Sequence, residues 1–410
     1  MHRAPLITLI LAGILLAATA ARAEYLAAID DWPEWVREGM AKEKRLKFRA
    51  VTTPDDSFSS RMPGKPKIEA IENGWYFLTD MRAGSPLECH YYTTSRDLGT
   101  LTDLLTEANI EAVVKNGGTL GERQLFQTGA GEVAGMPYIS LEWIYTIQQD
   151  GQTLVGFTKV RAATKGEAAF ACAHNYLGYR ETFAGAFAEF VTGANFEDAS
   201  PQPFYEEIAR LDMNGIGSGI THVSYTTDEE GYIRAQTVEA AVMPVDASTV
   251  VASDSYTISF STPGGELLNA YDISVEDGEL TANMRLQRNE QGDWVSSGML
   301  QGKDLEYEID GALQPHSELQ QIAMARELFA GETTSLDGLA WLPTADPTKF
   351  LEATMTRDDA EVERQARVTI GPLSFTGRFD VDGNLSDAAM NVGPASIRIE
   401  RIWFRGSMPR

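Results

Sequence analysis

The chain has 410 residues, of which 43% are apolar and 23% charged, and this ordinary globular composition excludes a collagen-like or wholly disordered protein. Asp and Glu number 59 against 34 Lys and Arg, which gives a formal net charge of -25. A field of that sign repels phosphate backbones, so we expect no nucleic-acid partner. The length is sufficient for about two or three domains of roughly 150 residues each.

Residues 1–23 predict a cleaved secretory signal peptide. A short basic start precedes an apolar run from Leu6 to Ala18, and Ala21-Arg22-Ala23 supplies the small-x-small cleavage pattern. The apolar run is shorter than the about 20 residues that span a bilayer, so an uncleaved anchor is the weaker alternative. No later segment has transmembrane length. We therefore expect cleavage after Ala23, a periplasmic or secreted protein and no integral membrane insertion.

Cys89 and Cys172 are the two cysteines of the chain, and export to an oxidising compartment favours a disulfide between them. Each has a neighbouring histidine, His90 and His174, so a tetrahedral zinc site is an alternative, as are two free thiols. The Cys-His and Cys-x-His spacings are shorter than the gap with which one loop usually supplies two zinc ligands. A structural disulfide is the prediction, with no metal site and no cofactor.

Residues 24–53 predict an N-terminal helical segment, which we expect to pack on the first domain; a docking segment is the alternative. Residues 54–196 mix strands and helices and predict an α+β domain. Asp97 is expected to cap an amphipathic helix, and a second helix is aromatic-rich. Between the two helices, alternating apolar residues from Ile139 to Ile147 indicate a strand buried on one face.

Part of this domain resembles the Mog1/PsbP-like family. Its opening, from Asp56 through Phe58 to the Pro63-Gly64-Lys65-Pro66 turn, is similar to the start of that family, and the aromatic helix Tyr179–Phe196 is similar to its closing helix. The resemblance covers about a third of the chain. It implies a sheet covered by helices that acts as a binding or assembly module, and it transfers no functional residue.

Residues 197–215 read as a linker, with a short helix predicted from Phe204 to Leu211. Residues 216–410 predict a β-rich domain with one central helix, which extends from Ser317 to Ala330. This outline is similar to the half-barrel folds of envelope carriers, which is an analogy of fold and not of function. The predicted fold class is α+β, with two domains of antiparallel sheet each packed with helices, the second a curved sheet around one helix.

Motifs with known chemistry fail when their context is considered. Gly215 to Gly219 lacks the strand-before, helix-after order of a phosphate loop and is interpreted as a hinge. Asp380 to Asn384 lies between predicted strands, which indicates a hairpin turn and not a calcium loop. His222 and His316 lie at the start of a strand and before a helix, so surface or capping positions are expected.

Two hypotheses on function follow. The first is a non-catalytic periplasmic or secreted protein that binds a hydrophobic small molecule or an envelope protein; Trp341 and Leu342 are its candidate pocket-lining residues, although the same loop is also suited to plug the sheet. The alternative is a periplasmic hydrolase using dispersed carboxylates, which leave no local motif. A hydrophobic tunnel under the second sheet would favour the first hypothesis, and a polar cleft with two carboxyl groups about 5–9 Å apart the second.

Overall fold

The computed structural model describes residues 32–82, 85–94, 97–198, 200–331, 333–358, 362–392 and 395–408. The predicted signal peptide, residues 1–23, lies outside these ranges. Among the described residues 58% are in strands and 14% in helices, so the predicted α+β class is wrong and the protein is mostly β. The second sheet is strongly curved, so side chains from its two halves pack against each other on the concave face. Helices cover only a small part of that face.

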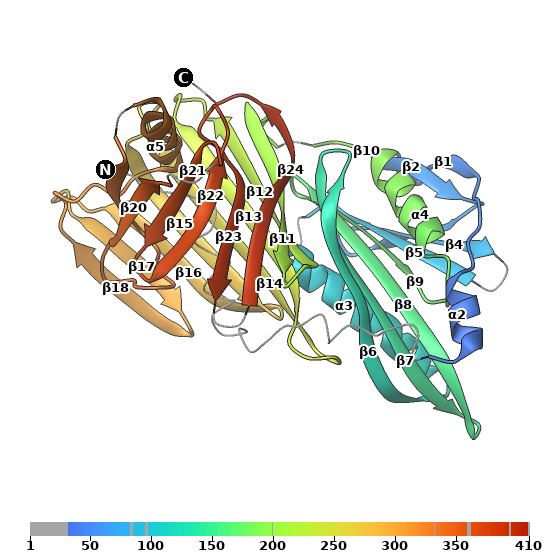
Figure 1. The fold of residues 1–410 in the computed structure, drawn as a ribbon. Coiled ribbons are helices and arrows are strands. Elements are labelled where there is room, and N and C mark those ends of the chain that lie inside the picture. Colours follow the sequence, from blue (N-terminus) through green and yellow to red (C-terminus); the bar gives the residue numbers. More distant parts are fainter. Residues whose placement is uncertain are drawn as a thin grey trace.

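The first domain is built on a seven-stranded antiparallel sheet in the order β3-β4-β5-β9-β8-β7-β6 (Figure 1). Its strands are β3 (Lys67–Ile71), β4 (Gly74–Arg82), β5 (Ser85–Tyr92), β6 (Thr119–Val133), β7 (Met136–Gln149), β8 (Gln152–Lys165) and β9 (Ala168–His174). A smaller sheet comprises β1 (Phe48–Thr52), β2 (Phe58–Pro63) and β10 (Asn195–Phe196). The helices are α2 (Glu34–Met40), α3 (Leu98–Lys115) and α4 (Arg180–Thr192).

The main sheet of this domain is covered on both faces, which explains why β9 is buried along its whole length. Phe170 and Cys172 belong to the cluster that contains α4, whereas Ala169 and Ala171 belong to the cluster that contains α3. The amphipathic helix after Asp97 and the aromatic helix are both present as expected. Val36 of α2 packs with residues of β7 and β8, so the described part of the N-terminal segment contacts this domain.

The second domain is a single fourteen-stranded antiparallel sheet in the order β18-β17-β16-β15-β14-β13-β12-β11-β24-β23-β22-β21-β20-β19 (Figure 1). Its first eight strands are β11 (Tyr205–Met213), β12 (Ile216–Thr227), β13 (Ile233–Pro244), β14 (Val250–Ser261), β15 (Leu267–Glu276), β16 (Glu279–Arg288), β17 (Trp294–Leu300) and β18 (Lys303–Ile309). Six more are β19 (Ser335–Ala340), β20 (Leu351–Arg357), β21 (Gln365–Ile370), β22 (Leu373–Phe379), β23 (Leu385–Val392) and β24 (Ala395–Gly406). The last strand therefore pairs with the first.

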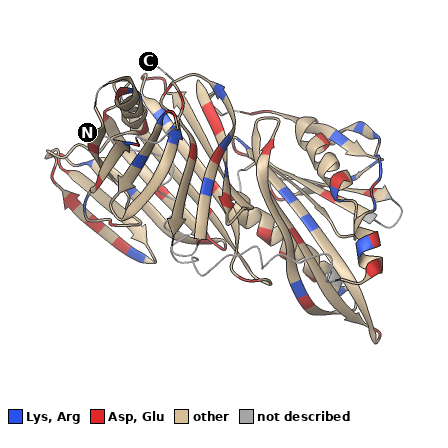
Figure 2. Ribbon diagram, in the orientation of Figure 1, with Lys and Arg blue, Asp and Glu red and all other residues tan. Residues whose placement is uncertain are grey.

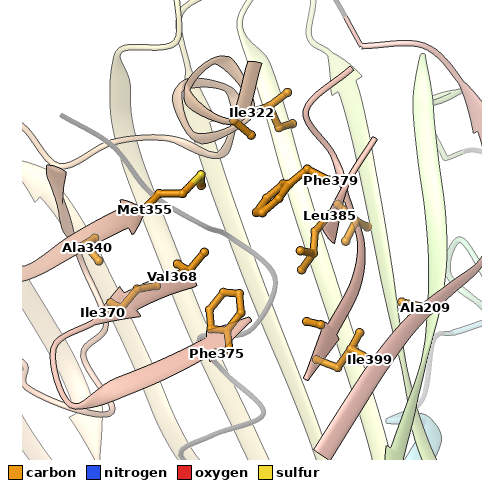
Figure 3. Close-up of a cluster of buried hydrophobic side chains, with 14 of the residues drawn as sticks. Ala209, Ile322, Ala340, Met355, Val368, Ile370, Phe375, Phe379, Leu385 and Ile399 are labelled. Atoms are coloured by element: carbon orange, nitrogen blue, oxygen red, sulfur yellow. The ribbon is translucent and has the colours of Figure 1, made fainter. Parts of the chain in front are cut away.

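The core of the second domain lies on the concave side of this sheet, together with α5 (Glu318–Ala330). Figure 3 shows Ile322 of α5 near Phe379 and Leu385. These two residues lie on β22 and β23, in the half of the sheet that does not contain β11. Ser317 caps α5 in a capping box. The helix predicted from Ser317 to Ala330 is thus present.

Two predictions between the domains are wrong in detail. The segment expected to form a helix from Phe204 is strand β11, which begins within the predicted linker 197–215. A strand is recognised in a sequence by alternating polar and apolar residues. In β11 this alternation is interrupted, because the acidic Glu207 is buried and the pairing register shifts between Ile208 and Ala209. The expected hinge at Gly215 is a tight hairpin turn, because Met213 and Ile216 pair directly.

Acidic residues are spread over both domains, and several gather on β18, one of the two outer strands of the large sheet (Figure 2). Charged side chains on an outer strand oppose the addition of a further strand from another molecule. No helix in the part of the chain that the structure describes is long and apolar enough to cross a membrane.

Candidate functional site

The two domains share a hydrophobic core. Leu98 and Leu101 of α3 and several residues of β6 and β7 belong to the same buried cluster as Ile220, Ala240 and Val242 of the second domain. Packing of this kind fixes the orientation of the domains, since separating them would expose apolar surface from both sides.

Polar contacts reinforce this junction at the N-terminus of α3. The carboxylate of Asp254, on β14, accepts hydrogen bonds from the backbone N–H groups of Gly99 at 2.8 Å and Thr100 at 2.9 Å. Asp97 does not cap its own helix with its side chain; its carboxylate accepts a 2.6 Å hydrogen bond from the hydroxyl of Tyr256. Burial raises the pKa of Asp254 to about 7, and the hydrogen bonds from Thr100 and Gly99 oppose that shift. The second domain thus caps a helix of the first.

A cleft of about 1220 Å³ lies beside this junction, between the first domain and the convex face of the second sheet. The floor near the junction includes Leu98 and Tyr256. On one side of the cleft, the tip of the β6–β7 hairpin approaches the second domain closely. Gly135 at this tip lies so near the indole ring of Trp403 that a Cβ atom added to it would be 3.1 Å from the ring. The cleft is therefore bounded by elements of both domains whose relative position is set by the shared core.

The wall formed by the second domain carries most of the basic groups of the cleft. Arg405 on β24 forms a 3.2 Å ion pair with Glu206 on β11, and the imidazole Nε2 of His222 lies 3.9 Å from the same carboxylate. The side chain of Arg234, on β13, has no hydrogen bond or ion pair with any residue that the structure describes. Burial lowers the pKa of its guanidinium. An arginine held in a cleft without an acid beside it is available to a ligand.

The wall formed by the first domain is predominantly acidic. Its carboxylates come from the turn before β2, the end of β6, the β8–β9 hairpin and the segment after β10. They belong to Asp56, Glu132, Glu167, Glu197 and Asp198. The one lysine on this wall, Lys165, has its ammonium 5.6 Å from the ring centre of Phe196. The two walls of the cleft consequently differ in the sign of their charge.

Of the residues singled out from the sequence, Cys89, Cys172, Trp341 and Leu342 lie away from this cleft, whereas His222, expected at a surface or capping position, is half-buried within β12 and lines it. Cys89 and Cys172 are directly opposite each other on β5 and β9 and form a disulfide, with their Cα atoms 4.1 Å apart. Leu342 is buried in the core of the second domain. The indole N–H of Trp341 donates a 3.1 Å hydrogen bond to Ser296, and its ring packs on a smaller apolar cluster that contains Trp294.

The histidines beside the cysteines are interior groups. His90 stacks on Tyr92, and burial lowers its pKa to about 4. His174 stacks on Phe183, and burial lowers its pKa to about 2. Within the described ranges, no group of three or more His, Cys, Asp or Glu is arranged to hold a metal ion.

Arg234, Gln236 and Ser224 were missed by the sequence analysis, although a pattern for them exists. In Ile233-Arg-Ala-Gln-Thr-Val-Glu-Ala240, every second residue is polar or charged, which predicts a strand with one polar face. That pattern cannot show that another domain stands opposite the polar face. The position of the cleft comes only from the contact between the domains.

Comparisons with known proteins found no matching family and no matching curated protein. Among solved structures, a beta-barrel-like protein of the domain of unknown function DUF1849 from Brucella abortus is 13% identical, with a TM-score of 0.38; the match covers 50% of this chain and 97% of that one. The cyanobacterial PsbP protein (CyanoP) from Synechocystis is 10% identical, with a TM-score of 0.27, and the match covers 38% and 95%. A PsbP protein is thus among the solved structures with a partial likeness to this chain.

Proposed function

We propose that this chain is a non-catalytic binding protein of the periplasm or extracellular space, and that its ligand or protein partner occupies the cleft between the domains. The supporting observation is the cleft itself, about 1220 Å³ in volume, with a guanidinium left unpaired among the described residues on one wall and carboxylates on the other. A disulfide suits an oxidising compartment.

Of the two ligand classes expected from the sequence, the lining does not suit the hydrophobic small molecule. Sites for apolar ligands are lined mainly by apolar and aromatic side chains with few polar groups. Here the aromatic side chains, Tyr91, Phe196, Tyr256 and Trp403, alternate with charged ones. Such a mixed surface suits a ligand that carries its own charges and hydrogen-bonding groups.

Native mass spectrometry of the full chain, purified from periplasm, tests this proposal. We expect an additional bound mass, which is absent from the Gln236→Trp variant because the indole fills the cleft from β13. The matched control is Arg367→Trp, since Arg367 is exposed on β21 and does not line the cleft. Loss of the bound mass in the control as well, or its retention in the Gln236 variant, contradicts the assignment of the cleft.

The acidic wall favours a second candidate, a hydrolase whose carboxylates act as acid and base. Glu132, Glu167 and Glu197 line the same cleft, and glycoside hydrolases use a pair of carboxyl groups as acid and base. The test is release of soluble fragments from purified cell-wall material. A hydrolase would lose that release in the Glu132→Gln or Glu197→Gln variant while still binding, and a binding protein would release nothing in any variant.

A further inference from the structure

A set of unpaired polar groups lies on the convex face of β12 and β13, within the cleft. No hydrogen bond joins the side chains of Ser224, Arg234 or Gln236 to any other residue in the described ranges. The Nε2 atom of His222 is buried and has no hydrogen-bond partner in the described ranges; its nearest acid is the carboxylate of Glu206, 3.9 Å away. Buried or half-buried polar groups are normally paired with protein, water or ligand, so this group of side chains is suited to bind something not part of the chain.

The register of the two strands brings these groups together. Ser224 is directly opposite Gln236, Thr226 is opposite Arg234, and His222 is opposite Val238. Directly opposed residues of an antiparallel pair share a face, and residues two apart on one strand share it as well. The Ser224–Gln236 pair therefore lies between Arg234 on one side and His222 on the other. We call these four residues, His222, Ser224, Arg234 and Gln236, the donor patch.

The chemistry of the donor patch selects an oxyanion. A guanidinium presents a planar fork of N–H donors that matches a carboxylate in a bidentate pair, and the hydroxyl and amide add neutral donors beside it. Arg234 is half-buried, where a charge-assisted hydrogen bond is weakened less by solvent than at an exposed site. Glu206 is the protein carboxylate near the patch: it is paired with Arg405 and lies 3.9 Å from His222, and no ion pair joins it to Arg234.

The opposite wall sets a second requirement. The carboxylates of Glu132, Glu167, Glu197 and Asp198 face the same cleft, and they would repel a ligand of purely negative charge. They attract a ligand that also carries a positive group. The volume of about 1220 Å³ exceeds the roughly 300–1,000 Å³ of most small-molecule sites, so a single amino acid would leave much of the cleft unfilled.

We propose that the cleft binds short peptides with free termini, with the peptide carboxylate on the donor patch and the peptide amine toward the acidic wall of the first domain. This inference rests on the proposed function, because it names the ligand class of the same cleft. Specificity then comes from the distance between the two charged termini of the peptide. The aromatic side chains that lie between the donor patch and the acidic wall contact the peptide without selecting one sequence.

The probe is a pool of tetrapeptides with randomised inner positions, offered to the full chain in three forms: free termini, amidated C-terminus and acetylated N-terminus. Bound peptide is measured by native mass spectrometry. We expect amidation to lower the bound fraction at least tenfold, since it removes the charge that Arg234 recognises. Acetylation is expected to lower it less, because several separate carboxylates share the amine.

Two variants isolate the role of the donor patch. Arg234→Gln should bind the free and amidated pools equally weakly, and Arg234→Lys should restore part of the preference for the free carboxylate. Arg367→Gln, on the exposed face of β21, is the control and should behave as the natural chain. An Arg234→Gln variant that still prefers the free carboxylate overturns the proposal, as does a chain that binds none of the three pools.

The two proposals fail in different ways. If the peptide inference alone is wrong, the bound mass obtained from periplasm is still lost in Gln236→Trp, but binding ignores the terminal charges of the peptides. If the cleft is not the binding site, Gln236→Trp retains its bound mass.

Discussion

The two domains hold their sheets together by different means. In the first domain a disulfide joins β5 to β9 inside an aromatic core, in which Phe58 stacks on Tyr91 with ring centres 4.1 Å apart. The second domain contains no cysteine, and a buried ion-pair network links its first strand to its last. The comparison shows two ways of joining strands that are far apart in the sequence: a covalent bond between β5 and β9, and a buried ion pair between β11 and β24.

The network of the second domain lies where β11 meets β24. Arg401 donates to the carboxylates of Glu207 at 3.1 Å and Asp380 at 2.8 Å, and the hydroxyl of Tyr205 donates to Glu207. Burial raises the pKa of Glu207, and the contacts with Tyr205 and Arg401 oppose that shift. Asp380 begins the β22–β23 turn, so three separate parts of the chain meet at one guanidinium.

The largest effect is expected in the first domain from the double substitution Cys89→Ala and Cys172→Ala. The disulfide closes a segment with a sequence separation of 83, and the chain-entropy estimate for such a loop is about 4–5 kcal/mol. Chemical denaturation followed by fluorescence would measure the loss in free energy of unfolding. Reductant should destabilise the natural chain by a similar amount and leave the variant unchanged; a further effect of reductant on the variant would contradict the explanation.

The matching experiment in the second domain is Arg401→Met. It leaves Glu207 buried without its cation, for which we expect a loss of about 3–5 kcal/mol in the free energy of unfolding. Arg398→Met is the control, because Arg398 is 52% exposed in its pair with Asp387 and a surface pair contributes about 0–1 kcal/mol. Equal losses in the two variants would show that the buried network has no special role in closing the sheet.

A smaller effect, dependent on pH, is expected at Asp272 on β15. Its carboxyl group is buried, makes no hydrogen bond with the described residues, and burial raises its pKa from 3.8 to about 7. Between those values the folded chain holds a proton that the unfolded chain has released. The resulting stability is present in full below about pH 4 and is lost as the pH rises toward 7.

Asp272→Asn should therefore leave the free energy of unfolding nearly unchanged at pH 4 and raise it by roughly 2–4 kcal/mol at pH 8. Denaturation curves at the two pH values measure the difference. Asp304→Asn, at an exposed position on β18, is the control and should alter neither value by more than about 0.5 kcal/mol. A uniform shift at both pH values would mean that the effect comes from packing and not from the proton.

What could be predicted from the sequence was local. The helix after Asp97, the aromatic helix and the helix after Ser317 follow from the spacing of apolar residues, and all three exist, although the side chain of Asp97 does not cap its helix as expected. The disulfide followed from two cysteines and an expected compartment.

What could not be predicted depends on residues far apart in the chain. In the sequence alone Glu207 is expected to be a surface acid, because its partner Arg401 lies on β24, almost 200 residues away. With Glu207 assigned to the surface, the pattern of β11 predicts a helix. The candidate site could not be predicted for the same reason. Arg234 and Gln236 mark a polar strand face in the sequence, but the acidic wall opposite them comes from another domain.

The pairing of β11 with β24 also sets the order of events in folding. Strands β11 to β18 can pair in sequence, each beside its predecessor, but the other edge of β11 pairs with β24, which lies roughly 180 residues further along the chain. Until β24 has folded onto it, the half-formed sheet presents an unpaired strand edge that can pair with another chain.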